Sequence, residues 1–248
     1  HATAVPEEPL RTGFVDYVVR GEGEEIMLQL YRAIHGVMSP SSILGLSYKE
    51  NGEIISNQPA SLIPDLNILP IFPYHKFTNP KYDSSFIVSS RGCPYRCTFC
   101  AAPTINGKPV RTHSPEYITE HVKYLYEEKG IEWFNIIDDN FTLRKSYAKN
   151  VCRALIDLNL PVKFGTPNGI RLQKGDVELW SLMKQAGWEF LVIAPESGSQ
   201  NTLNIMKKDL DLNIVPPIID DIHSAGLSVQ AFFIVGYPGE TYADLQLT

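Results

Sequence analysis

The sequence of 248 residues lacks long hydrophobic runs and an excess of positive charge, and it has few cysteines. No apolar stretch approaches the roughly 20 residues that a membrane-spanning helix needs, so we expect no membrane span. The 28 Asp and Glu outnumber the 22 Lys and Arg, giving a net charge of −6. Because phosphate neutralisation needs a basic surface, this balance argues against binding of duplex nucleic acid. Four cysteines are too few for a disulfide scaffold.

Both ends of the sequence suggest a piece of a longer protein. The chain opens at His1 without an initiator Met and without a basic-then-apolar signal sequence. It closes just after residues 242–245, which read as the start of a helix. We therefore expect an internal fragment.

From residue 84 onward, strand-like and helix-like segments alternate. The predicted strands are 86–89, 133–137, 162–164, 190–193 and 229–235, and the predicted helices are 115–129, 144–159, 176–186, 199–208 and 214–225. Such alternation is typical of right-handed βαβ units and a parallel sheet, either doubly wound or part of a barrel. In both folds the functional residues lie on loops after the carboxyl ends of the strands.

The first 83 residues follow a different pattern. A strand at 14–19 precedes a helix at 25–34, and a hairpin is predicted about Asn51-Gly52. Residues 58–82 are rich in proline but carry apolar side chains, so we predict a linker that packs on the rest of the protein.

Three of the four cysteines follow the first strand of the alternating series at a C-x3-C-x2-C spacing: Cys93, Cys97 and Cys100. Thiolates so close in sequence can each ligate a different iron of one small cluster. A [4Fe–4S] cluster has four irons, so three protein ligands leave one iron open for an exogenous group. Flanking Arg91 and Arg96 would offset the negative charge of such a cluster.

A structural zinc site is the alternative for these cysteines. Zinc normally takes two C-x2-C pairs or one pair with two His, and neither pattern is present. His113 could in principle complete a set of three Cys and one His. The fourth cysteine, Cys152, lies on the apolar side of a predicted helix, and we predict that it packs in the core.

The cysteine spacing after the first strand of a βα series, with Phe99 directly before the last cysteine, resembles the radical S-adenosylmethionine (SAM) superfamily. The resemblance covers about 84–248 and implies an α/β fold, a partial (β/α) barrel with about five βα units. It implies that Cys93, Cys97 and Cys100 hold a [4Fe–4S] cluster whose open iron is chelated by SAM. Reductive cleavage of SAM would then yield a 5′-deoxyadenosyl radical, with the protein excluding water and oxygen.

The resemblance also assigns polar residues after the second and third strands to cofactor binding. Asp138, Asp139 and Asn140 take the place of the motif that meets the methionine amino group, although the usual Gly-Gly-Glu is absent. The acids could otherwise cap the following helix. Asn168 and Arg171 would touch cofactor or substrate, or pair with these acids.

The fourth and fifth strands end in further candidate SAM contacts. Glu196 matches the position whose carboxylate accepts hydrogen bonds from the ribose hydroxyls, with Ser197 beside it, although it could also cap the next helix. The fifth strand resembles the G-x-I-x-G-x-x-G adenine motif, in which glycine permits close approach of the base. The candidate adenine contacts are Ile234, Gly236, Gly239 and Phe99.

The front of the chain resembles the C-terminal end of the Rossmann-like cobalamin-binding domain that precedes many radical SAM enzymes. The predicted organisation is therefore the end of that domain at 1–40, a hairpin and linker at 41–83, and a truncated radical SAM core at 84–248. The cobalamin-ligating loop would lie upstream. We expect cobalamin in the full-length parent and not in this fragment alone.

The resemblance implies radical SAM chemistry, with cobalamin-dependent methyl transfer or a related radical reaction on a small-molecule or peptide substrate. An external electron donor such as flavodoxin or ferredoxin and a reducing cytoplasm are implied as well. One alternative is a radical SAM enzyme without cobalamin, methylthiotransferase-like or an oxidoreductase, which an upstream Asp-x-His-x-x-Gly would exclude. The other is a non-catalytic iron–sulfur binding or redox-sensing module, which would not need Glu196 or the adenine motif.

Overall fold

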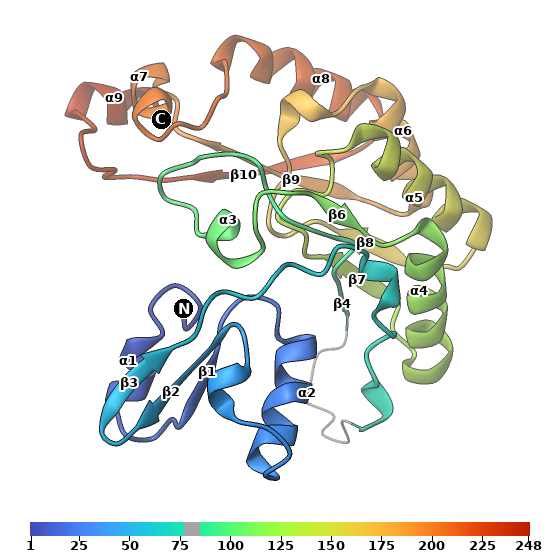
Figure 1. The fold of residues 1–248 in the computed structure, drawn as a ribbon. Helices are drawn as coiled ribbons and strands as arrows, with labels where there is room; N and C mark the ends of the chain where they lie inside the picture. Colours follow the sequence, from blue (N-terminus) through green and yellow to red (C-terminus); the bar gives the residue numbers. More distant parts are fainter. Residues whose placement is uncertain (77–84) are drawn as a thin grey trace. The chain divides into compact units, whose positions relative to one another are not determined.

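The computed structural model describes residues 1–76 and 85–248, and the chain divides into two compact units (Figure 1). The first unit comprises His1–Pro64, Gly92–Tyr95 and Cys100–Val110, and the second comprises Asp65–Arg91, Arg96–Phe99 and Arg111–Thr248. The end of the predicted linker, 77–83, and residue 84, where the predicted core begins, lie outside the described residues. The domain boundaries drawn from the sequence remain predictions.

The first unit is built on a three-stranded antiparallel sheet in the order β1-β2-β3. Its elements are α1 (Glu7–Arg11), β1 (Tyr17–Val19), α2 (Gly23–Ile34), β2 (Leu46–Glu50) and β3 (Glu53–Ser56). The predicted hairpin is confirmed, with Asn51 at φ 52° and Gly52 at φ 86° between β2 and β3. Ile26 and Leu30 of α2 pack with Leu46 in the core of this unit. Because β1 pairs with β2, the boundary predicted at 40/41 crosses this sheet.

The second unit contains parallel strands that neighbour one another in chain order. They are β4 (Phe86–Ile87), β7 (Trp133–Ile136), β8 (Lys163–Gly165), β9 (Phe190–Glu196) and β10 (Ser228–Phe233). The first three form one sheet and the last two a second, and isolated parallel bridges from Phe164 to Trp188 and from Ile170 to Ile193 continue the series from β8 to β9. The predicted α/β fold is confirmed. A strand order that follows the chain is that of a (β/α) barrel, because a doubly wound sheet reverses direction.

Helices follow these strands in the predicted alternation. They are α4 (Pro115–Lys129), α5 (Lys145–Leu158), α6 (Val177–Ala186), α7 (Gln200–Ile205), α8 (Val215–Ser224) and α9 (Tyr242–Leu247). Ser114 caps α4 through the N–H of Tyr117, and Gly130 ends it in the left-handed conformation, as the sequence predicts. Cys152 of α5 is buried, which confirms its predicted core position. No helix of the described chain has the length and apolar character that a membrane crossing requires.

Several predicted elements are shorter than expected, among them the strand predicted at 14–19, which begins only at Tyr17. The strand predicted at 86–89 ends at Ile87, because Ser89 and Ser90 turn toward the side chain of Asp138. The helix predicted at 199–208 ends at Ile205, because Lys207 adopts φ 52°, which cannot continue a right-handed helix.

The remaining short elements were not predicted. They are β5 (Ser90–Arg91), β6 (Arg111–Thr112), α3 (Ala102–Ile105) and the 3₁₀ turns Pro40–Ser42, Leu66–Ile68, Tyr74–Lys76, Leu172–Lys174 and Leu212–Ile214.

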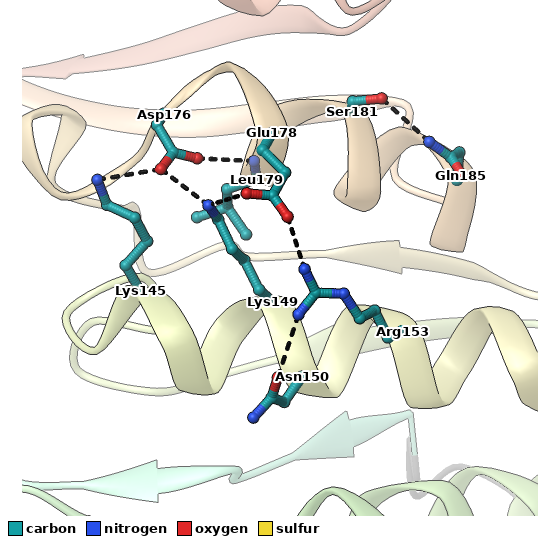
Figure 2. A network of polar contacts seen from close by, with 9 residues as sticks. All are labelled: Lys145, Lys149, Asn150, Arg153, Asp176, Glu178, Leu179, Ser181 and Gln185. Atoms are coloured by element: carbon teal, nitrogen blue, oxygen red, sulfur yellow. Dashed lines mark hydrogen bonds and ion pairs between the residues drawn. The ribbon is translucent and has the colours of Figure 1, made fainter.

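Helices α5 and α6 are joined by a network of ion pairs (Figure 2). The Nζ of Lys149 lies 2.9 Å from Asp176 and 2.5 Å from Glu178. Arg153 reaches the other oxygen of Glu178 at 2.6 Å. Asp176 also accepts the N–H of Leu179 at 2.9 Å and so caps α6. The network therefore aligns the two helices and fixes the start of the second.

Candidate active site

The cysteine segment begins and ends at a two-stranded neck in the second unit. Ser90 and Arg91 of β5 pair antiparallel with Arg111 and Thr112 of β6, so the ladder closes the loop of residues 92–110. We call β5, β6 and Ser89 the neck.

Asp138, at the end of β7, lies against this neck. Its side chain is 2% exposed and accepts the N–H groups of Ser89 at 2.6 Å and Ser90 at 3.0 Å, both on Oδ1. The hydroxyls of the same two serines donate to Oδ2, each at 2.6 Å. Burial raises the pKa of Asp138 to about 6, against the lowering effect of these hydrogen bonds.

The other polar residues after β7 and β8 form contacts of their own. Asn140 is buried, and its Oδ1 accepts from the hydroxyl of Thr142 at 3.2 Å. Its buried Nδ2 has no hydrogen-bond partner within the part of the chain that the structure describes. Asn168 donates to the backbone carbonyl of Ile137 at 2.8 Å and so joins the ends of β7 and β8. Asp139 is half-buried between its two buried neighbours.

Arg171 contacts one of the three motif cysteines. Its guanidinium is buried, and Nη2 donates to the Sγ of Cys97 at 3.1 Å. The second nitrogen, Nη1, approaches the carbonyl oxygen of Asp209 at 3.5 Å. The chain therefore directs a positive charge and an N–H donor at this sulfur, as expected at a thiolate-ligated cluster.

A buried ion pair stands at the end of β9. Glu196 is 7% exposed and adopts φ 73°, an uncommon conformation for a residue with a side chain. Its Oε1 lies 2.8 Å from the Nζ of Lys208, which is also buried. The same ammonium lies 5.8 Å from the centre of the Phe99 ring. The sequence analysis missed Lys208, because a lysine at the end of a predicted helix is ordinarily a solvated charge.

A turn at residues 206–209, which we call the 206–209 turn, fastens the segment around Cys97. The carbonyl of Met206 accepts from the N–H of Thr98 at 3.0 Å and from its hydroxyl at 3.1 Å. Lys207 and Asp209 both adopt φ 52°. Non-glycine residues in this conformation are strained, and such residues cluster at functional sites. No sequence pattern predicted this turn.

The segment predicted to contact adenine follows β10. The N–H of Ile234 donates to the carbonyl of Glu196 at 2.8 Å, which continues the pairing of β10 with β9. Gly236 and Gly239 adopt φ 76° and 90°, so both need glycine's freedom. The N–H of Gly236 is held by the carboxylate of Glu240 at 2.7 Å.

Phe99 and Tyr237 bring the cysteine segment and the adenine segment together. Their rings meet edge to face with centroids 6.4 Å apart, and the hydroxyl of Tyr237 lies 2.5 Å from that of Thr98. Phe99 remains 38% exposed, so part of its ring is accessible to a ligand. Ser197, in contrast, is fully buried, and its Oγ accepts the N–H of Ser199 at 3.1 Å. Ser197 therefore organises the start of α7.

Cys93 and Cys100 group with the first unit. The N–H of Cys93 donates to the carbonyl of Gly107 at 3.0 Å, and the Sγ of Cys100 lies 3.5 Å from the N–H of Ala102. A Cβ at Gly92 would fall 2.1 Å from the carbonyl oxygen of Pro109, so only glycine fits directly before Cys93.

The donor set suits an iron–sulfur cluster in its chemistry. Within the described residues, Cys93, Cys97 and Cys100 carry thiols outside any disulfide and are half-buried or exposed, whereas Cys152 is buried. Within residues 1–76 and 85–248, no three His, Cys, Asp or Glu side chains are grouped so that they could hold a metal ion. His113, the candidate fourth zinc ligand, is buried and stacks on Tyr117 with centroids 3.9 Å apart.

Comparison with known proteins identifies the family. Residues 87–248 match the model of the radical SAM superfamily. The whole chain is similar to an uncharacterized methyltransferase of Pyrococcus horikoshii, at 31% identity over 55% of that protein. It is also similar to cytidylyl-2-hydroxyethylphosphonate methyltransferase of Streptomyces wedmorensis, at 28% identity over 99% of this chain and 54% of the relative. The chain thus spans about half the length of these relatives.

Among solved structures, the fold matches the radical SAM methyltransferase TsrM of Kitasatospora setae, with cobalamin and a [4Fe–4S] cluster bound. The TM-score is 0.80 at 18% identity, and the match covers 98% of this chain and 50% of that one. At this identity the likeness is one of fold. The match of the family model to residues 87–248, well over half of the chain, shows that the chain belongs to the radical SAM superfamily.

Proposed function

We propose that this chain binds a [4Fe–4S] cluster through Cys93, Cys97 and Cys100 and cleaves SAM reductively, as the radical-generating part of a longer methyltransferase. The observation that carries the proposal is the setting of Cys97 within the second unit. Arg171 holds its sulfur, and Thr98 fastens the segment to the 206–209 turn. When bound, the cluster supplies the electron that breaks a carbon–sulfur bond of the SAM sulfonium.

The residues around Cys97 then bind and orient SAM. Lys208 engages Oε1 of Glu196, and we assign Oε2 to the ribose hydroxyls. The exposed part of the Phe99 ring covers one face of adenine, and the backbone of residues 234–239 reads its edge. Asp139 and Asn140 are our candidates for the methionine amino group. These contacts fix the sulfonium in one orientation, which is the contribution that positioning makes to catalysis.

We test this function by electron paramagnetic resonance of the anaerobically reconstituted, dithionite-reduced chain, with and without SAM. The expected result is a [4Fe–4S]⁺ signal that changes shape when SAM is added. A cluster signal indifferent to SAM would instead support an electron-transfer or redox-sensing module. Cys97→Ala should lose the cluster, and Cys152→Ala, the matched control at a buried cysteine, should keep its iron. Full iron content in Cys97→Ala would refute the ligand assignment.

We further propose that the longer protein uses cobalamin to transfer a methyl group to a small-molecule or peptide substrate. The names of two relatives and the cobalamin bound by TsrM support this. A flavodoxin or ferredoxin in a reducing cytoplasm would supply the electron. The longer protein should retain the visible absorbance of cobalamin after gel filtration, and this chain alone should not. An active longer protein without cobalamin would favour methylthiotransferase-like or oxidoreductase chemistry.

A further inference from the structure

We infer that Asp138 is a positioning residue that fixes the start of the cysteine loop through Ser89 and Ser90, and that it does not bind SAM. The inference rests on the proposed function, since it concerns the loop that carries the cluster ligands. It replaces the role that sequence resemblance gives to this carboxylate.

The hydrogen bonds of Asp138 carry the inference. An ionised carboxylate offers about four acceptor sites. Ser89 and Ser90 occupy Oδ1 with their two N–H groups and Oδ2 with their two hydroxyls, at 2.6 to 3.0 Å. Both serines and Asp138 are buried. A methionine ammonium at this carboxylate would have to displace one of these bonds and leave a buried donor unpaired, which costs free energy.

The neck is held from two further sides. The carbonyl of Ser89 accepts the N–H of His113 at 2.9 Å and the hydroxyl of Tyr147 at 2.9 Å. Asp138 lies just after β7, Tyr147 lies in α5, and His113 directly follows β6, the strand that closes the loop. Backbone and side chain of Ser89 are thus fixed by three separate elements. Cys93 follows four residues later, so the geometry of the neck sets where the cysteine loop begins.

Three variants separate positioning from ligand binding. Asp138→Asn can still accept the two N–H groups on its oxygen and donate its NH₂ to the two serine hydroxyls, because a hydroxyl both donates and accepts. Asp138→Ala removes all four bonds, and Ser89→Ala with Ser90→Ala removes the two on Oδ2. Ser181→Ala, at a serine whose hydroxyl accepts from Gln185 on α6 (Figure 2), is the control.

The readouts are iron loss to a chelator and SAM affinity of the reconstituted chain. We expect Asp138→Ala and the double serine variant to lose iron about tenfold faster than the parent, the scale found for residues that orient metal ligands. Asp138→Asn should rescue iron retention and leave SAM affinity within about twofold. A roughly tenfold loss of SAM affinity in Asp138→Asn with unchanged iron would overturn the inference, since it would indicate a direct contact with the amino group.

Amide hydrogen exchange of the cluster-free chain tests the neck independently of the cluster. Asp138→Ala should lose protection of the Ser89 and Ser90 amides while Trp188 in the core stays protected, and Asp138→Asn should keep it. Unchanged protection of these amides in Asp138→Ala would refute the role of Asp138 in holding the neck. Failure of the parent chain to bind iron would instead count against the proposed function, and the exchange result would still decide the role of Asp138.

Discussion

At the scale of single residues, the contact between Arg171 and Cys97 predicts an effect on the cluster. An N–H donor and a positive charge at a ligand sulfur stabilise the reduced, more negative state. Arg171→Met should therefore lower the midpoint potential, and Arg171→Lys, which keeps the charge without the planar fork, should lie between it and the parent. A redox titration followed by electron paramagnetic resonance measures the midpoint potential. A shift of about 59 mV corresponds to a tenfold change in the ratio of reduced to oxidised cluster.

The control for this prediction is Arg153→Met, at an exposed arginine in the network of α5 and α6. Its potential should equal that of the parent. If Arg171→Met kept its iron and the parent's potential, the hydrogen bond to Cys97 would have no influence on the cluster.

The buried pair of Glu196 and Lys208 predicts a coupled effect on stability. Lys208→Met leaves the carboxylate buried without its counter-charge, which should lower the free energy of unfolding by about 3 kcal/mol. Combining it with Glu196→Gln removes that charge and should recover most of the loss. Urea denaturation of the parent, both single variants and the double variant gives the coupling energy. Strictly additive changes would show that the two groups do not act as a pair.

The candidate site could be predicted only in part at this scale. The spacing of the cysteines and the places of Arg171 and Glu196 after strands marked them as candidates, because strand ends converge in this fold class. Their partners lie far away in the chain: Cys97 is 74 residues from Arg171. Hydrophobic periodicity carries no information about such pairs, so Lys208 and the two serines that engage Asp138 were missed.

At the scale of elements, two helix ends differ in how strictly they require glycine. Gly187 ends α6 at φ 112°, and a Cβ there would lie 2.5 Å from the carbonyl oxygen of Val162. Gly130 ends α4 at φ 65°, with no atom within 4 Å of such a Cβ. Gly130→Ala should cost about 1 kcal/mol, the strain of the left-handed conformation. Gly187→Ala should lower the stability clearly more, because the backbone at Val162 must also move to make room for the Cβ.

Thermal unfolding of the two glycine variants and the parent measures the two stability losses. Both variants carry the backbone strain of a left-handed alanine. Only Gly187→Ala also brings its Cβ against the carbonyl oxygen of Val162, the residue before β8, so the difference between the two variants isolates this collision. Equal shifts in melting temperature would contradict the prediction.

Elements with strong local signals were predicted well. The helix 115–129 has the same bounds in the structure, because Ser114, Pro115 and Gly130 mark its ends chemically. The two-residue strands of the neck have no periodicity to detect. The end of α7 at Ile205 depends on the 206–209 turn, which also contacts Thr98 and Gln173, residues far away in the chain that local sequence does not reveal.

At the scale of the whole molecule, the two units do not follow sequence order. Residues 92–95 and 100–110 group with the first unit, while 96–99 group with the second. The boundary predicted at 83/84 remains a prediction, whereas the grouping into units reflects contacts between distant residues. The cysteine motif therefore contributes Cys97 to one unit and Cys93 and Cys100 to the other.

Two buried titratable groups of the second unit should oppose each other in the pH dependence of stability. Burial lowers the pKa of His121 from 6.5 to about 4, so the folded chain binds fewer protons than the unfolded chain between these values. Its contribution to the unfolding free energy is therefore lost as the pH falls through this window. Burial raises the pKa of Asp138 from 3.8 to about 6, so the folded chain binds more protons there, and its contribution is lost as the pH rises.

The two contributions are each about 3 kcal/mol and have opposite signs, so they should largely cancel between about pH 4 and 6. His121→Gln removes the histidine contribution, so the free energy of unfolding of this variant should rise on acidification relative to the parent. Asp138→Asn removes the carboxyl contribution, so its free energy of unfolding should fall on acidification relative to the parent. The double variant lacks both contributions and should again follow the parent. Urea denaturation across this window measures the four slopes, and the titratable groups that all four chains share cancel in the comparison. Identical slopes in the two single variants would contradict the assigned pKa directions. Opposite slopes would show that the carboxylate at the neck and the histidine of α4 together keep the stability of the second unit nearly independent of pH.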